Sequence, residues 1–308
     1  MDSSGSMLKT AIERIRGFLD DPDLEAKYSD DYIVRHIISP AFASVLSRVN
    51  NSASNPVIHK ISFPLVKNQQ DYQLPPAVGE VMRLCISDEM GRVLQEALPR
   101  GFWNLRGPNW QIQGNVISFI PLPPEAYSTM ELWYIPSGDY KPVYSTGGVA
   151  AFTLSTDKSY ATITVTTAAT VGDWDRRPSA YVGQMMRLLP ATGVVEERLI
   201  SGWDYQGGSG WKVSFRRPFT DATGNANLPA FEIAPEGSEN LFEAVAAAGA
   251  LKLASYRKLS GEHFGMVQAA YRDAMKTLMD HYSNMQMRLP KSWEKDTVDN
   301  QLTQPWRI

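Results

Sequence analysis

The fold class of this chain is decided by residues 115–138, which read Asn-Val-Ile-Ser-Phe-Ile-Pro-Leu-Pro-Pro-Glu-Ala-Tyr-Ser-Thr-Met-Glu-Leu-Trp-Tyr-Ile-Pro-Ser-Gly. β-Branched and aromatic residues predominate in 115–120 and 129–135, and prolines separate the two runs, which predicts two strands joined as a hairpin. The period of two places Trp133 and Tyr134 on opposite faces of the second strand. No recognisable catalytic group stands beside them, so we interpret this stretch as a structural β layer.

Helices are expected at both ends of the chain. Apolar residues recur at steps of three and four in 7–19, from Ser29 to about Val49, and over most of 236–289. Ser29, Ser238 or Asn240, and Ser260 are suitable N-caps. Pro40 lies inside the second helix and is expected to kink or split it.

Between these helices the sequence is typical of strands and turns. In the first half, strands are also expected at 57–63, 80–87 and 109–113. A second β unit over 145–235 contains an alternating strand at 161–167 and a hairpin at 201–215.

The predicted fold class is therefore α+β, with antiparallel β domains inserted between the terminal helices. A helical body combines 1–50 with 236–289, a β domain covers 57–140, and a second inserted β domain covers 145–235. Residues 290–308 have no apolar period and are expected to form an extended C-terminal arm.

The composition limits the functional classes. At 308 residues with 43% apolar residues, the chain can bury a full core. The net charge is −3 and no long segment has a basic surplus, which disfavours sequence-specific nucleic-acid readout. The lone Cys85 excludes an intrachain disulfide framework. The sequence has neither an apolar run of membrane-spanning length nor a signal-peptide core, which fits assembly in the cytosol.

Recognisable catalytic or metal-binding motifs are absent from the sequence, so no enzyme activity, cofactor or metal is predicted. The histidines His36, His59, His263 and His281 have no metal-ligand spacing and are interpreted as structural. Acidic pairs such as Glu196/Glu197 and Asp173/Asp175 could serve a glycosidase, but most chains of this length carry such pairs. One group of aromatic residues either fills a core or lines a carbohydrate or protein surface: Tyr160, Trp174, Tyr181, Trp203, Tyr205 and Trp211.

Three stretches together resemble the head-to-tail connector proteins of tailed bacteriophages, the adaptors that bind below the portal. The first is Lys27–Ile38, which has an aspartate-rich cap followed by an apolar helix. The second joins the Tyr-x-Leu-Pro turn in 71–75 to the 110–124 region and to Leu132-Trp-Tyr-Ile-Pro136. The third is the alanine-rich helix pair in Leu241–His281.

The resemblance implies a non-enzymatic virion protein at the head-tail junction. It implies a ring, commonly of twelve copies, that docks on the portal, continues the DNA channel and carries tail tube, nozzle, spike or fibre proteins. DNA would pass with only non-specific contact, and no membrane is involved. Pro40 and the long insertion at 145–235 depart from a compact adaptor.

Residue roles follow from the same resemblance. The C-terminal arm would bind the portal through Trp293, Leu302, Trp306, Arg307 and Ile308. Ring and subunit packing would involve Ile33, Ile37, Phe242, Val245, Gly249, Tyr256 and Tyr271. The β insertion would contact tail proteins through Trp203, Tyr205 and Trp211. The alternatives are another phage tail or baseplate structural protein, a carbohydrate-binding β module, and a soluble hydrolase whose carboxylates meet only in the fold.

Overall fold

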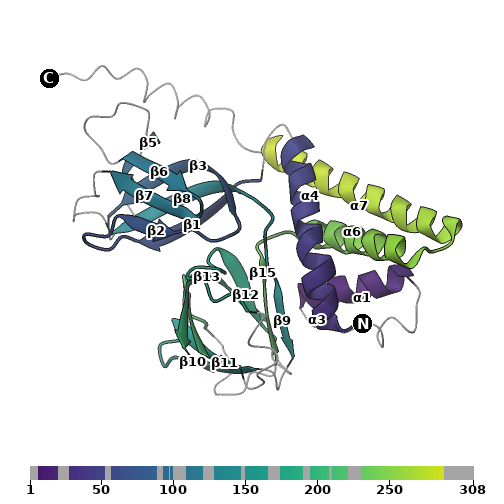
Figure 1. Cartoon of the computed structure of the whole chain (residues 1–308), viewed down its shortest axis with the longest axis horizontal. Helices are drawn as coiled ribbons and strands as arrows, with labels where there is room; N and C mark the ends of the chain where they lie inside the picture. Colours follow the sequence, from purple (N-terminus) through teal and green to yellow (C-terminus); the bar gives the residue numbers. More distant parts are fainter. Residues whose placement is uncertain are drawn as a thin grey trace.

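The protein has an α+β fold in which a helical body stands beside two β units (Figure 1). The predicted mixed fold class with antiparallel sheets is confirmed. The computed structural model describes residues 6–19, 28–52, 57–88, 93–96, 98–99, 109–120, 128–146, 150–165, 174–189, 195–207, 210–220 and 230–287.

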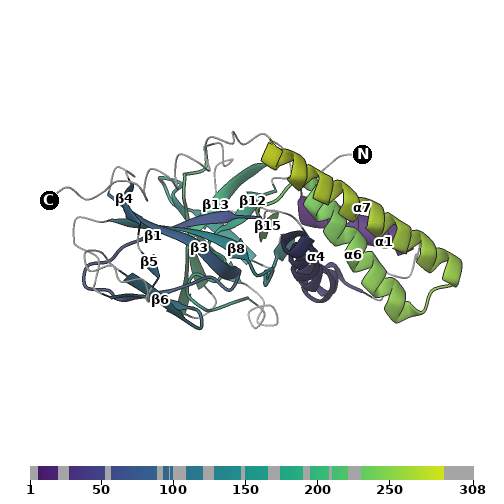
Figure 2. The same ribbon diagram turned by 90° about the horizontal axis from the view of Figure 1, so that it is seen from above.

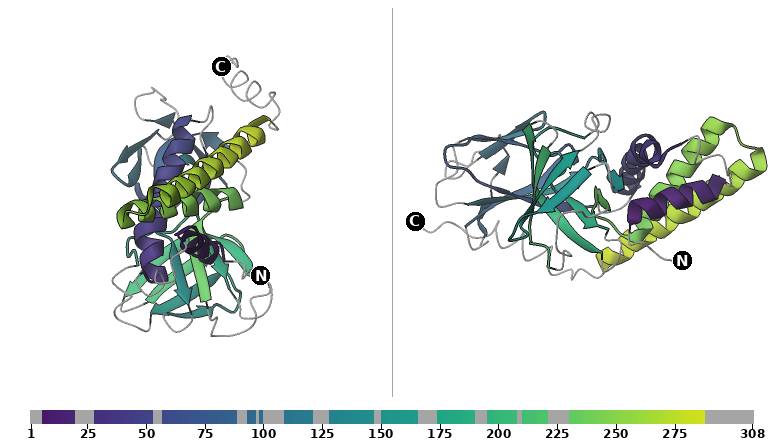
Figure 3. Two further views of the ribbon diagram at one scale, coloured as in Figure 1. Left: turned by 90° about the vertical axis from the view of Figure 1, so that its right-hand side faces the viewer. Right: turned by 90° about the horizontal axis from the view of Figure 1, so that it is seen from below.

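Both ends of the chain contribute to the helical body, as Figures 2 and 3 show. Ser29 and Ser238 cap their helices by accepting hydrogen bonds from the backbone N–H groups of Tyr32 and Leu241, as their positions predict. Buried apolar side chains from every one of these helices except the three-residue α3 form one core. The helices are α1 (Met7–Leu19), α3 (Asp30–Tyr32), the π-helix η1 (Ile33–Ile38), α4 (Ser39–Ser52), α6 (Glu239–Arg257) and α7 (Gly261–Met287).

Pro40 changes the form of its helix without ending it. The π-helical turns of η1 precede Pro40, and α4 continues through it. Proline has no N–H to donate to the carbonyl of His36 four residues earlier. The Lys252 Nζ atom of α6 donates to that carbonyl oxygen at 3.3 Å, so a neighbouring helix supplies the missing donor.

The first β unit consists of two four-stranded sheets whose side chains meet in one core. The predicted hairpin over 115–138 is wrong in its pairing: β7 and β8 form as strands but belong to different sheets. Their connection, 121–128, has eight residues and three prolines, which is longer than the two to five residues of a usual hairpin loop. One sheet has the order β1 (His59–Pro64), β8 (Thr129–Pro136), β3 (Val78–Ser87), β4 (Val93–Glu96), and the other has β2 (Asp71–Gln73), β7 (Val116–Ile120), β6 (Asn109–Gln113), β5 (Leu98–Pro99).

The second β unit is one seven-stranded antiparallel sheet. The first strand of this unit along the chain, β9, pairs with its last strand, β15, so the two strands that connect the unit to the rest of the chain are neighbours in the sheet. The predicted hairpin at 201–215 is confirmed as β13 and β14. The strand order is β10 (Ala150–Leu154), β11 (Tyr160–Val165), β14 (Gly210–Phe215), β13 (Glu196–Gly207), β12 (Gln184–Leu188), β15 (Ala230–Pro235), β9 (Val143–Thr146).

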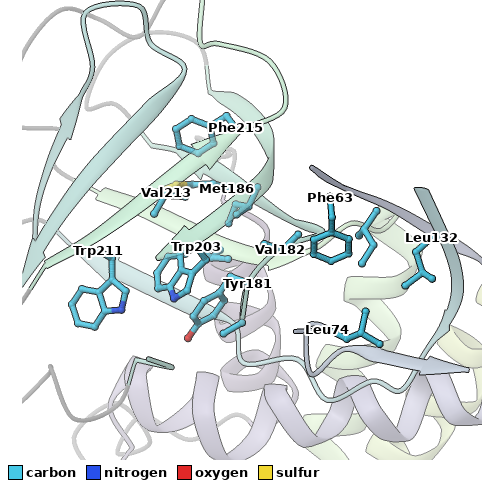
Figure 4. Close-up of a cluster of buried hydrophobic side chains, with 14 of the residues drawn as sticks. Phe63, Leu74, Leu132, Tyr181, Val182, Met186, Trp203, Trp211, Val213 and Phe215 are labelled. Atoms are coloured by element: carbon cyan, nitrogen blue, oxygen red, sulfur yellow. The ribbon is translucent and has the colours of Figure 1, made fainter. Parts of the chain in front are cut away.

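The two β units share one continuous core (Figure 4). In Figure 4, Val182 lies between the aromatic pair Tyr181 and Trp203 on one side and Phe63 of the first unit on the other. A Cβ atom added at Gly183 would lie 2.5 Å from the Cγ2 atom of Ile61, so the backbone at Gly183 packs directly against the Ile61 side chain of β1. The inserted sheet therefore packs directly on the first unit.

Gly138 fixes the path from β8 to the second β unit across the helical body. Its φ is +81°, and an added Cβ atom would lie 2.5 Å from the Cα atom of Ala43 in α4. A side chain at this position would combine a left-handed backbone with a clash against a helix. Tyr140, just beyond it, is buried against Phe42 with ring centroids 6.1 Å apart.

Candidate functional site

A shallow groove of about 390 Å³ runs over α4, α6 and α7 on the helical body. Its lining includes the small side chains Ala41, Ser44 and Ala248, which would let a neighbouring helix approach the backbone closely. The remaining lining residues are Pro40, Arg48, Leu251, Lys252, Ser255, Phe264 and Tyr271.

Arg48 and Tyr271 form a polar contact between two helices of this groove. The Arg48 Nη1 atom donates to the Tyr271 hydroxyl at 3.1 Å, and the guanidinium carbon lies 5.6 Å from the ring centroid. This pair joins α4 to α7.

Exposed apolar side chains stand near the turn between α6 and α7. Tyr256 is 64% exposed and Met266 is 68% exposed. Their burial against a partner would remove apolar surface from water, which is the main source of association energy. The groove and Tyr256, whose ring centroid lies 5.9 Å from the Nζ atom of the groove residue Lys252, together form the helical face, the candidate interaction surface of the protein.

Most residues predicted to pack subunits together lie instead inside the single chain. Ile33, Ile37, Phe242, Val245 and Gly249 belong to the contacts of the helical core, where the four large side chains are at most 4% exposed. A direct role in contacts between subunits is therefore corrected to a role in positioning the helical face. Of the other two residues of the set, Tyr256 is exposed, and Tyr271 lines the groove while being 9% exposed.

The residues predicted to contact tail proteins are also mostly internal. Trp203 and Trp211 are 1% and 0% exposed, and Trp203 donates its indole N–H to the Asp175 carbonyl oxygen at 2.9 Å. These two indoles fill the core of the seven-stranded sheet, so their assignment to a partner surface is corrected. Tyr205 is half-buried, and its ring packs against Trp211 at 5.3 Å. The sequence did not decide whether these aromatic residues fill a core or line a surface, and the burial of Trp203 and Trp211 shows that these two fill a core.

A buried charge cluster joins the helical body to the seven-stranded sheet. Glu232 of β15 is fully buried and accepts hydrogen bonds from Ser6 Oγ at 2.6 Å, Met7 N at 3.0 Å and Leu8 N at 3.1 Å. It therefore satisfies the free N–H groups at the start of α1, where the helix dipole favours negative charge.

Arg187 completes this cluster from β12. Its Nη1 atom lies 3.2 Å from Glu232 Oε1, and its Nε atom lies 2.8 Å from Oε2 of the exposed Glu197. The sequence pattern did not predict these roles. The available signal was a charged residue within the apolar stretch Ala230–Pro235, but its partners are 45 or more positions away.

The carboxylate pairs considered for catalysis are occupied by structural contacts. Glu196 accepts from the Thr220 backbone N–H at 3.0 Å, whereas Glu197 binds Arg187. Asp175 is held by Arg177 and by Lys141, whose Nζ atom is 3.1 Å away, while Asp173 lies outside the described residues. Among the residues that the structure describes, no three His, Cys, Asp or Glu side chains gather as metal ligands would.

His59 is the histidine with the most unusual environment. Burial lowers its pKa to about 4, so the ring is neutral at pH 7. Its Nδ1 atom is 3.5 Å from the Tyr140 hydroxyl, and its ring packs against Tyr134 at 6.0 Å. Burial also raises the pKa of Tyr134 and Tyr140. These groups are uncharged at neutral pH and are suited to packing.

The predicted portal-binding residues Trp293, Leu302, Trp306, Arg307 and Ile308 lie outside the described residues. None of the described helices combines the length and apolar character that crossing a lipid bilayer requires. Comparison with known proteins adds no identity: no protein-family profile matches the chain, and no curated protein matches it by sequence.

Proposed function

We propose that this chain is a non-enzymatic virion structural protein, a head-to-tail adaptor that docks as a ring under a portal. The observation that carries the proposal is the helical body, which both chain ends build beside the β units (Figure 2) and whose helices α4, α6 and α7 form the helical face. Identical subunits in a ring meet through two different surfaces of each copy, and closure requires a fixed geometry at that contact. The packed helices α4, α6 and α7, with α4 joined to α7 by the Arg48–Tyr271 hydrogen bond, suit such a surface.

Electron microscopy of the purified protein mixed with the portal of the same virus tests the proposal. We expect a ring stacked on the portal, with the helical body toward the ring axis or the neighbouring subunit. The exposed Tyr256 offers a matched pair with Tyr160, which is 38% exposed on the second β unit. Tyr256→Glu is expected to prevent ring formation and Tyr160→Glu to leave it intact. Monomers without portal affinity would overturn the proposal.

A carbohydrate-binding role is not favoured by the aromatic residues that first suggested it. Sugar binding uses exposed aromatic faces, whereas Trp174, Tyr181, Trp203 and Trp211 are all at most 5% exposed. Another tail or baseplate role shares most of the observations. It would be recognised by a ring or fibre that assembles on tail proteins without the portal.

A further inference from the structure

An open groove of about 1250 Å³ lies where the helical body meets both β units. It is distinct from the helical face: β1, β12, β13, the 216–220 segment and the last turns of α7 line it. Figure 2 shows the C-terminal end of α7 beside the β part of the molecule, while the α6–α7 turn points away from it.

The groove is basic in a chain that is acidic as a whole. Its lining contains five basic residues, Lys60, Arg187, Arg198, Arg216 and Arg217, and two acidic residues, Glu197 and Glu236, whereas the whole chain has a net charge of −3. Three of the five are already paired: Lys60 with Glu131, Arg187 with Glu197 and Glu232, and Arg198 with Glu196. Arg216 and Arg217 are exposed, and neither guanidinium forms an ion pair with another described residue.

Apolar groups and a free strand edge accompany these guanidinium groups. Ile58 is 50% exposed at the groove, and the partly buried Met185 and Leu199 line it nearby. β1 is the end strand of its sheet, and none of the described strands pairs with its outer side. An extended peptide with acidic and apolar side chains matches all three features, because its backbone can pair with such an edge.

We propose that the occupant is the C-terminal segment of the same chain, residues 288–308. α7 ends at Met287, and Tyr282 within its last two turns already lines the groove, so the segment starts beside it. Its 21 residues can extend over roughly 70 Å. Its acidic side chains, Glu294, Asp296 and Asp299, cluster in 293–299 beside Trp293 and one basic residue, Lys295, whereas Arg288, Lys291 and Arg307 lie outside this stretch. The stretch 293–299 therefore complements Arg216, Arg217 and the apolar side of the groove.

Docking in this groove gives the segment two competing positions. A segment held against β1 and Arg216 is withheld from any external partner until that partner outcompetes the groove. If the portal is that partner, docking regulates the proposed assembly. The intramolecular contact itself does not rest on the proposed function, and it is tested on the isolated protein.

Hydrogen exchange on the full chain and on a chain ending at Met287 tests the proposal. A tethered segment has an effective concentration of about 1 mM. A Kd of about 0.1 mM for the groove would then slow amide exchange at 57–60 by about tenfold in the full chain. Arg216→Glu with Arg217→Glu is expected to abolish this protection. Arg272→Glu with Lys276→Glu, an equal charge change on the exposed side of α7, is expected to keep it.

A charge swap separates a specific contact from a loss of folding. Glu294→Arg, Asp296→Arg and Asp299→Arg in the Arg216→Glu/Arg217→Glu chain are expected to restore the protection. Equal exchange in the full and shortened chains would overturn the proposal, as would protection that increases with protein concentration, since the occupant would then belong to a second copy. Persistent protection in the shortened chain would assign the groove to another segment and overturn it equally.

Discussion

The helical body and the β units bury their apolar surface with different kinds of side chain. The helical core is rich in alanine and branched aliphatic residues, and α6 alone buries Ala244, Ala246, Ala247, Ala250 and Ala254. The β core is rich in aromatic rings, with Tyr181 and Trp203 centred 4.4 Å apart and Trp174 and Trp211 centred 5.2 Å apart. Small residues let helices approach closely, whereas large rings fill the space between sheets. The two regions should therefore fail under opposite changes of volume.

Removal of volume from the aromatic core has the largest expected effect. Trp203→Ala would leave a cavity among Trp174, Tyr181 and Trp211 and lower the free energy of unfolding by about 5 kcal/mol. Urea denaturation measures this loss. Trp133→Ala is the control, because that ring lies partly exposed on the sheet between Lys60 and Arg83, at 4.8 and 5.4 Å. We expect it to cost about 1–2 kcal/mol, and an equal loss for both variants would contradict the comparison.

The junction between the two regions is expected to be nearly as sensitive, through charge. Glu232→Ala would leave the buried Arg187 and the first N–H groups of α1 without their acceptor and cost about 3–4 kcal/mol. Glu197→Ala removes the other carboxylate on the same guanidinium, but its side chain is 52% exposed. Water can replace it, so the expected cost is about 1 kcal/mol or less. Similar midpoints of urea denaturation for the two variants would show that burial of the carboxylate does not determine the cost of removing it.

Addition of volume should harm the helical core, in contrast to the β core. A Cβ atom at Gly249 of α6 would lie 2.9 Å from Ile37 Cγ2 and 3.1 Å from Ile15 Cδ1. Gly249→Ala is therefore expected to cost about 1–3 kcal/mol despite the better helix propensity of alanine. Gly265→Ala in α7 meets no atom within 4 Å and should gain about 0.5–1 kcal/mol. Thermal unfolding compares the two, and a gain at Gly249 would refute the close approach.

The helices were predicted with greater detail than the sheets because their signals are local. Apolar spacing and Ser29 or Ser238 caps depend on residues three or four positions apart, and both caps form as expected. Strand pairing depends on distant partners. The strands predicted at 115–120 and 129–135 form, but they do not pair with each other. β7 pairs with β2 and β6, whereas β8 pairs with β1 and β3.

The candidate surfaces were predictable only in part for the same reason. Trp203 and Trp211 were correctly recognised as strand residues, yet their burial depends on β11, β13 and β14 coming together. The basic groove needs Lys60 and Arg216, which are more than 150 positions apart in the chain. Residue type predicts what such groups can bind, whereas only the fold shows which of them meet.

Acid is expected to lower the stability of the second β unit through protonation of Asp175. Burial on its own raises the pKa of this carboxyl, but hydrogen bonds from Arg177 and then Lys141 outweigh it and hold the pKa at about 2. Because the folded pKa lies below the unfolded value of about 3.9, this stabilisation is full above about pH 4 and is lost as the pH falls toward 2.

After allowance for solvent screening, we expect this effect to be about 1–2 kcal/mol. Urea denaturation between about pH 5 and pH 2.5 measures it against Asp175→Asn, which should lose this part of the pH dependence. An unchanged slope in that variant would assign the acid sensitivity to other carboxyl groups.

The smallest expected effect lies in the turn between α6 and α7, where backbone conformation and not volume is at issue. Lys258 closes α6 with a left-handed backbone, φ 52° and ψ 48°, while its N–H donates to the carbonyls of Ala254 and Ser255. A glycine keeps that hydrogen bond and avoids the steric cost of a Cβ atom in a left-handed backbone, which is about 1–2 kcal/mol. This gain is partly offset because glycine loses more conformational entropy on folding than lysine does. Lys258→Gly should therefore gain about 0.5–1 kcal/mol in thermal unfolding. Lys258→Ala keeps the Cβ atom and should change little, so a comparable gain from alanine would place the effect in the exposed lysine side chain instead of the backbone.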